Sequence, residues 1–173
     1  GPTFTTNPTS TQTICVGGSI NPLNVAYSGG FGTPTYQWYR VGTPNTAVGT
    51  NSSSYTPPTS AVGSASYYCV ISFSSGGCSS ATSSTAIVIV NPLPTVNAQP
   101  TPLQTVCVGG SVPAYTVSYN DGYGTASYQW YTNTTGSTNA GTPVGINSAS
   151  YTPPIFTTAT PADYYYYAVI SFT

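Results

Sequence analysis

Apolar and polar residues alternate along the chain in short runs, and turns rich in glycine, serine and proline separate one run from the next. Such runs predict β-strands, because successive side chains of a strand point to opposite faces of a sheet. In the first half of the chain we expect strands at 11–15, 20–27 and 34–40, around Ala47, and at 53–56, 66–73 and 85–90. Short strands at this spacing predict an all-β chain folded as a β-sandwich.

The second half of the chain repeats the first. Residues 14–39 and 106–131 align without a gap, and the stretch SYTPP recurs at 54–58 and 150–154. The chain therefore predicts two tandem sandwiches, each preceded by a proline-containing stretch that is expected to be extended. The expected parts are a linker-like segment at 1–10, a first unit at 11–90, a Pro-rich linker at 91–102 and a second unit at 103–173.

The second unit lacks a counterpart of the last strand of the first. Thr173 aligns with Ser74, so nothing in 103–173 matches the stretch STAIVIV. A sandwich without this strand exposes its core and leaves backbone groups unpaired. Three explanations stay open: the chain is part of a longer repetitive protein, a neighbouring subunit supplies the strand, or the alignment is out of register. The N-terminal stretch PTFTTNPTSTQTI is one potential donor.

Aromatic residues mark the expected core. Trp38 and Trp130 lie in the third strand of each unit, where Ig-like sandwiches bury a tryptophan. Tyr67 and its counterpart Tyr166 are the other expected core aromatics, and Tyr67 stands two residues before Cys69. That spacing is typical of the tyrosine corner, in which the hydroxyl bonds to nearby backbone. We therefore expect both units to be of the Ig-like type.

Four cysteines allow three pairings. The second unit keeps Cys107 at the position of Cys15 but has alanine in place of Cys69, so we expect Cys69 to be a small buried residue and Cys15 to pair with Cys78. Such a bridge would contribute roughly 4 kcal/mol in the loop-entropy model and implies an oxidising, extracellular setting. Cys107 is expected either to bridge two chains or to have its partner in a segment outside 1–173.

Charged residues are almost absent, with one basic and two acidic side chains and no histidine. General acid–base catalysis, nucleophile activation and zinc binding all need groups that this chain lacks, so we expect no enzyme, no metal site and no cofactor. Phosphate backbones need a basic surface, which excludes nucleic acid as a partner. The longest apolar run, AIVIV, is too short to cross a membrane.

Two Asn-x-Ser/Thr sequences, at Asn51 and Asn133, are candidate glycosylation sites. By the repeat they are expected to occupy corresponding loops. Attached sugar, or the many serine, threonine and asparagine side chains, would keep so uncharged a surface in solution.

The motifs CVGGS, YQWY, SYTPPTS, YYCVISF and GCSSATSSTAIVIVNPLPTV together resemble the tandem Ig-like or PKD-like repeats of very large secreted surface proteins. Such repeats occur in Bacteroidetes-type adhesins and in archaeal surface proteins. The resemblance covers nearly all of both units and implies an extracellular stalk, filament or adhesin without catalytic residues.

The expected function is therefore a structural or adhesive module of a cell-surface fibre, filament or giant adhesin, located outside the cell. Its expected partners are copies of itself or adjoining repeats, with polymerisation by strand complementation between subunits as one form. The alternative is a carbohydrate-binding module, in which exposed aromatics such as Tyr39, Tyr123 and Tyr131 stack on sugar rings of surface glycans.

Overall fold

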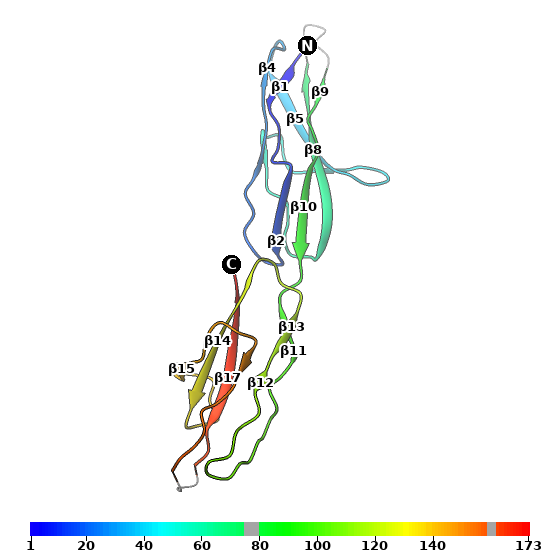
Figure 1. Ribbon diagram of the computed structural model, residues 1–173. Helices are drawn as coiled ribbons and strands as arrows, with labels where there is room; N and C mark the ends of the chain where they lie inside the picture. The colour runs from blue at the N-terminus through cyan, green and yellow to red at the C-terminus, as the bar shows by residue number, and fades with distance from the viewer. Residues whose placement is uncertain (75–79, 159–161) are drawn as a thin grey trace. The chain divides into compact units, whose positions relative to one another are not determined.

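The computed structural model describes residues 1–74, 80–158 and 162–173, and every regular element in them is a β-strand. The chain divides into two compact units, Gly1–Pro92 and Leu93–Thr173. In each unit strands from distant parts of the sequence lie side by side (Figure 1). The expectation of an all-β, Ig-like fold is confirmed.

One layer of the first unit consists of two short antiparallel pairs. β1 (Thr3–Thr6) pairs with β4 (Ala26–Ser28), and β3 (Leu23–Asn24) pairs with β7 (Ser54–Tyr55). The run expected as one strand at 20–27 is thus split near Val25. It splits because the chain changes partner there, from β7 to β1.

The other layer is a larger sheet with the strand order β2-β10-β8-β5-β6, in which β9 also pairs with β8. Its central contact is the antiparallel pairing of β8 with β10, and β10 pairs on its other edge with β2 in parallel. The bounds are β2 Thr11–Cys15, β5 Pro34–Arg40, β6 Thr46–Val48, β8 Gly63–Phe73, β9 Ala81–Thr82 and β10 Ala86–Asn91.

The core of the first unit lies between these layers. Trp38 is fully buried, its ring lies 5.9 Å from that of Tyr55, and its indole N–H donates to the Ser52 carbonyl at 2.9 Å. Tyr67 is 3% exposed. In β10 the alternate residues Ala86, Val88 and Val90 are buried, which is the pattern expected of a strand with one face in the core.

The second unit has the same plan with fewer paired strands among its described residues. β11 (Thr95–Ala98) pairs with β13 (Ser118–Asn120), and β12 (Tyr115–Thr116) pairs with β16 (Ser150–Tyr151). The other layer has the order β15-β14-β17, with bounds Thr142–Val144, Ala126–Asn133 and Tyr165–Phe172. Trp130 is fully buried and donates to the Ser148 carbonyl at 2.9 Å.

Both proline-containing stretches that were expected to be linkers contain a strand. Thr3–Thr6 forms β1, which pairs with β4, and Thr95–Ala98 forms β11, which pairs with β13 of its own unit. The prolines flank these strands rather than interrupt them, so the backbone N–H groups that the ladder needs are present. These strands belong to the sandwiches.

Replacing Trp38 with phenylalanine is expected to lower the free energy of unfolding by about 1–3 kcal/mol, because the Ser52 carbonyl loses its donor. Urea unfolding followed by circular dichroism measures the change. Val62→Ala is the control, since Val62 is 56% exposed and the substitution should cost less than about 0.5 kcal/mol. Equal stabilities for Trp38→Phe and the unmodified chain would contradict the assigned role of the indole N–H.

Candidate functional site

The two units differ most at one edge of the sheet that holds the buried tryptophan. In the first unit β8 has partners on both sides, β5 on one and β10 with β9 on the other. Its counterpart β17 pairs with β14 over all eight residues. Within 93–158 and 162–173 no strand pairs with the other edge of β17. This edge is the open edge of β17.

Alternate side chains of β17 are less buried than the corresponding side chains of β8. Tyr67, Cys69 and Ile71 of β8 are 3%, 0% and 0% exposed. The matching residues of β17, which are Tyr166, Ala168 and Ile170, are all partly exposed. The difference follows from β9 and β10, because β10 pairs with Gly63–Tyr67, β9 pairs with Val70 and Ile71, and no strand in the described part of the second unit takes either place. Of the expected core residues, Tyr166 is therefore the one that is incompletely buried.

A groove of about 350 Å³ runs along this edge, and we call it the β17 groove. Its lining comes from the second unit only. No charged side chain takes part, and most of the contributing side chains are apolar or aromatic, including Val96, Val117, Tyr166, Ala168 and Ile170. A groove of this composition is suited to an uncharged, apolar occupant.

A second consequence of the open edge appears at residues 103–107. The matching segment Thr11–Cys15 forms β2, and all five of its residues pair with β10. Residues 103–107 form no strand, although the Gln104 side chain keeps the same bond to the following loop that Gln12 makes. The local sequence is therefore sufficient for the bond of the glutamine side chain to the loop, whereas a strand at this position needs a neighbouring strand such as β10.

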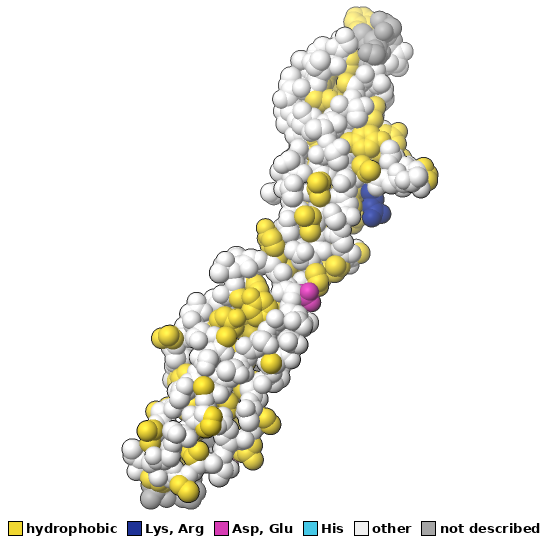
Figure 2. All heavy atoms as spheres, turned by 45° about the vertical axis from the view of Figure 1, so that its right-hand side comes forward, with side chains coloured by type: hydrophobic (Ala, Val, Ile, Leu, Met, Phe, Trp, Pro, Cys, Tyr) yellow, Lys and Arg dark blue, Asp and Glu magenta, His cyan; other side chains and the backbone are white. Residues whose placement is uncertain are grey.

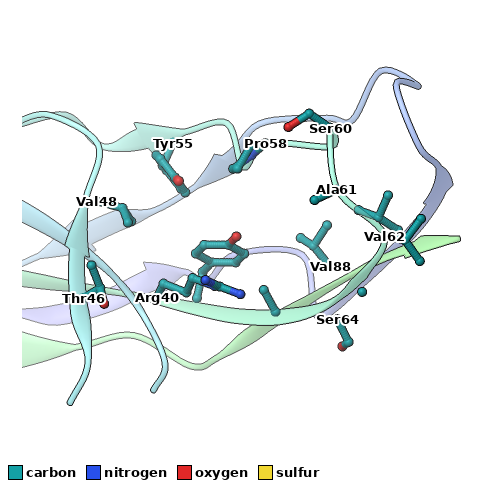
Figure 3. A pocket seen from close by; sticks show the side chains of 14 residues that line it. Arg40, Thr46, Val48, Tyr55, Pro58, Ser60, Ala61, Val62, Ser64 and Val88 are labelled. Carbon is teal, nitrogen blue, oxygen red and sulfur yellow. The ribbon is translucent and has the colours of Figure 1, made fainter. Parts of the chain in front are cut away.

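The first unit contains a recess of about 360 Å³ between its layers (Figure 3). Tyr55 and Pro58 lie on one side and Arg40 and Val88 on the other. Burial raises the pKa of Tyr67, and the nearby Arg40 guanidinium lowers it in part. Arg40 is exposed and is the only basic side chain of the chain, and its counterpart is Thr132. The recess offers the Arg40 donor and several hydroxyl groups, and no carboxylate or imidazole is among the side chains that line it.

The aromatics considered for sugar binding do not form a row. Tyr39 stacks on Tyr68 with ring centroids 5.2 Å apart, and Tyr131 stacks on Tyr167 at 5.0 Å, so each has one face covered. Tyr123 is 54% exposed, but it precedes β14 whereas Tyr131 lies near the end of that strand. At about 3.3 Å per residue, the five steps of β14 from Ala126 to Tyr131 alone span about 16 Å.

Three of the four cysteines lie in the described residues, and none of the three is in a disulfide there. Cys69 is fully buried, as expected, and Cys15 and Cys107 also have free thiols, the latter exposed. Cys78 lies outside the described residues. Cys15 pairs with Asn91 at one end of the sheet, whereas Ser74 follows the far end of the long strand β8. The Cys15–Cys78 bridge thus finds no support in the described residues, and an inter-chain role for Cys107 remains a prediction.

The two candidate glycosylation asparagines occupy different environments. The Asn51 side-chain oxygen accepts the Tyr36 N–H at 2.8 Å, and the counterpart of this bond is made by Asn147, not by Asn133. Asn133 donates both of its amide hydrogens, to the carbonyls of Ser137 and Asn139. Its expected correspondence with Asn51 is therefore wrong, because the second unit has an insertion in this loop that changes the offset between matching residues. A glycan on Asn133 would break one of these bonds.

Among the described residues there is no group of three or more His, Cys, Asp or Glu side chains that could hold a metal ion. The same residues include no helix of the length and hydropathy needed to cross a membrane.

Stability is expected to fall as the pH rises above about 9. Burial raises the pKa of the Cys69 thiol from its ordinary 9.0 to about 11, and it also raises the pKa of Tyr67 and Tyr166. The folded state therefore holds these protons more tightly than the unfolded state. The contribution of the Cys69 thiol is complete below pH 9 and is lost as the pH rises through about 11, and the two tyrosines add to the decline at high pH.

Urea midpoints measured across this pH range test the assignment. Cys69→Ala, which copies the alanine of the second unit, should remove the part of the decline that begins near pH 9 and leave the tyrosine part. A decline of the same size and onset in Cys69→Ala would contradict the role given to the thiol.

No curated protein matches the chain. Solved structures that resemble its fold include the N-terminal four Ig domains of Dscam1 isoform 4.44, at 18% identity and a TM-score of 0.42 over 94% of this chain and 40% of that chain. Sidekick-1 immunoglobulin domains 1–5 match at 15% identity and a TM-score of 0.46, over 82% and 28%. A chimeric titin Z1Z2-Z1Z2 tandem matches at 21% and 0.38, over 98% and 92%.

The chain spans less than half the length of the Dscam1 and Sidekick-1 chains, and at these identities the likeness concerns the fold alone. The family model described as "Ig-like domain CHU_C associated" matches residues 2–92, which is more than half of the chain and includes β1 to β10. This match confirms the resemblance inferred from the motifs. The protein belongs to the family of CHU_C-associated Ig-like domains.

Proposed function

We propose that the chain is a structural and adhesive repeat module of an extracellular cell-surface fibre, filament or giant adhesin. In this role it associates with copies of itself or with adjoining repeats. The observation that supports the proposal is that the core contacts of the first unit recur in the second, whereas the charged residues do not.

The repeated features are hydrogen bonds and ring contacts of the core. Gln37 and Gln129 each bridge two carbonyl groups at 2.9 and 3.1 Å, and the indole and asparagine bonds of the two units match in the same way. The charged residues are not repeated, since Arg40, Asp121 and Asp163 have the counterparts Thr132, Gly29 and Ser64. A module whose shape alone recurs fits the role of a scaffold.

The surface supports association with similar units. The net charge is −1, and charged groups appear only as small spots on the face shown in Figure 2. Little like-charge repulsion therefore opposes contact between copies, and contacts that are individually weak gain strength in an array. No specific observation favours the carbohydrate-binding alternative, because its tyrosines are separated or have one face covered.

Beads coated with the chain are expected to cluster with one another. Clustering should be nearly the same between about 50 mM and 500 mM NaCl, because exposed charges that salt could screen are scarce. Light scattering measures cluster size, with albumin-coated beads as the control. Beads that stay dispersed would contradict self-adhesion, and binding to an immobilised glycan array instead would favour the carbohydrate alternative.

A further inference from the structure

We infer that the β17 groove is a docking site for a β-strand supplied from outside residues 1–173, with the residue pattern of β9 and β10. The inference rests on the proposed function and deepens it, because it names the surface and the kind of partner through which one repeat joins another. The partner is an extended, uncharged segment in which small or β-branched apolar residues occupy every second position.

The first unit shows how such a strand sits. β10 runs antiparallel to β8, with Ala86 opposite Tyr67 and Val90 opposite Gly63, and parallel to β2. By the repeat, the incoming strand runs antiparallel to β17. Its β9-like part lies beside Val169 and Ile170, and the first small residue of its β10-like part lies opposite Tyr166. Its other edge then faces residues 103–107, which are expected to join the sheet as β2 does.

The chemistry of the groove agrees with this occupant. In the first unit Ala86, Val88 and Val90 point into the core and are 0%, 2% and 5% exposed, whereas Ile87 is 39% exposed. The residues that line the β17 groove carry no charge, and β10 carries none either. Backbone hydrogen bonds would provide affinity, and the alternate inward side chains would provide register.

No described strand of the chain is free to act as the donor within the same molecule or from an intact second copy. The N-terminal segment considered as a donor is already paired, β1 with β4 and β2 with β10. β10 itself lies between β2 and β8, so a second copy could donate it only by giving up its own core. A strand from outside residues 1–173 has no such cost.

The test uses a fluorescent peptide with the sequence of residues 81–91, ATSSTAIVIVN, which includes the residues of β9 and β10, added to the full chain. Fluorescence anisotropy is expected to show saturable binding. A peptide with Val88→Asp and Val90→Asp should lose binding, because it would place carboxylates on the face of the strand that packs into the core in the first unit. A peptide with Ile87→Thr and Ile89→Thr changes only the outward face and should bind within about threefold of the original.

Two chain variants locate the site. Ala168→Asp, in the groove, should weaken binding at least about tenfold, whereas Ser171→Asp, exposed on the same strand and outside the groove lining, should change it less than about threefold. Circular dichroism verifies that both variants are folded. Binding that Ala168→Asp leaves unchanged would place the peptide in the first unit and overturn the inference.

Two other results would also overturn the inference. One is the absence of peptide binding to the folded chain. The other is a chain that sediments as a dimer which the peptide cannot dissociate, since a second copy would then be the occupant. Peptide binding without bead clustering would leave the docking site standing and reject self-adhesion, so the two proposals fail separately.

Discussion

Pairing between β8 and β10 is the interaction on which the rest of the first unit depends. It covers Tyr67, and together with β9 and Ser83 it also covers Cys69 and Ile71; in addition, it places β10 where β2 can join the sheet. The chain contains a nearly matched comparison, because β17 repeats the strand that needs this cover and the described second unit does not provide it. Both the exposure of the inner face of β17 and the lack of a strand at 103–107 follow from that one difference.

Other features of the fold do not depend on this pairing. The buried indole with its bond to a serine carbonyl is the same in both units, and so is the asparagine that accepts the backbone N–H of a tyrosine at the start of the tryptophan strand. These contacts join β5 or β14 to the loop that follows the next strand. They explain why the second unit keeps its central pair of strands with one edge of the sheet open.

The sequence predicts a strand best where the run of strand-forming residues coincides with the segment that pairs with a neighbouring strand. The strands 11–15 and 34–40 were predicted with the observed bounds, because each is a run of strand-forming residues bordered by glycine or proline turns. The run at 20–27 was only partly right, since a change of partner at Val25 leaves no mark in the residue pattern. The prolines that flank β1 and β11 favour linkers, so the residue pattern does not predict these two strands.

The sequence predicted only part of the candidate site. The alignment showed that a counterpart of STAIVIV is absent from 103–173, but not that residues 103–107 would fail to form a strand although β2 has nearly the same sequence. The expected pairing of Cys15 with Cys78 rests on comparing the cysteines of the two units, and it stays a prediction because Cys78 lies outside the described residues. The match of Asn51 with Asn133 failed because an insertion shifts the true counterpart to Asn147.

Residue-level hydrogen exchange tests the central claim most directly. The Cys69 N–H donates to the Ser83 hydroxyl at 2.9 Å on the edge covered by β9 and β10, whereas Ala168 holds the same position on the open edge of β17. We expect the Ala168 amide to exchange at least about a hundredfold faster than that of Cys69, with Val70 and Val169, which face the tryptophan strands, protected alike. Equal protection of Cys69 and Ala168 would contradict the account.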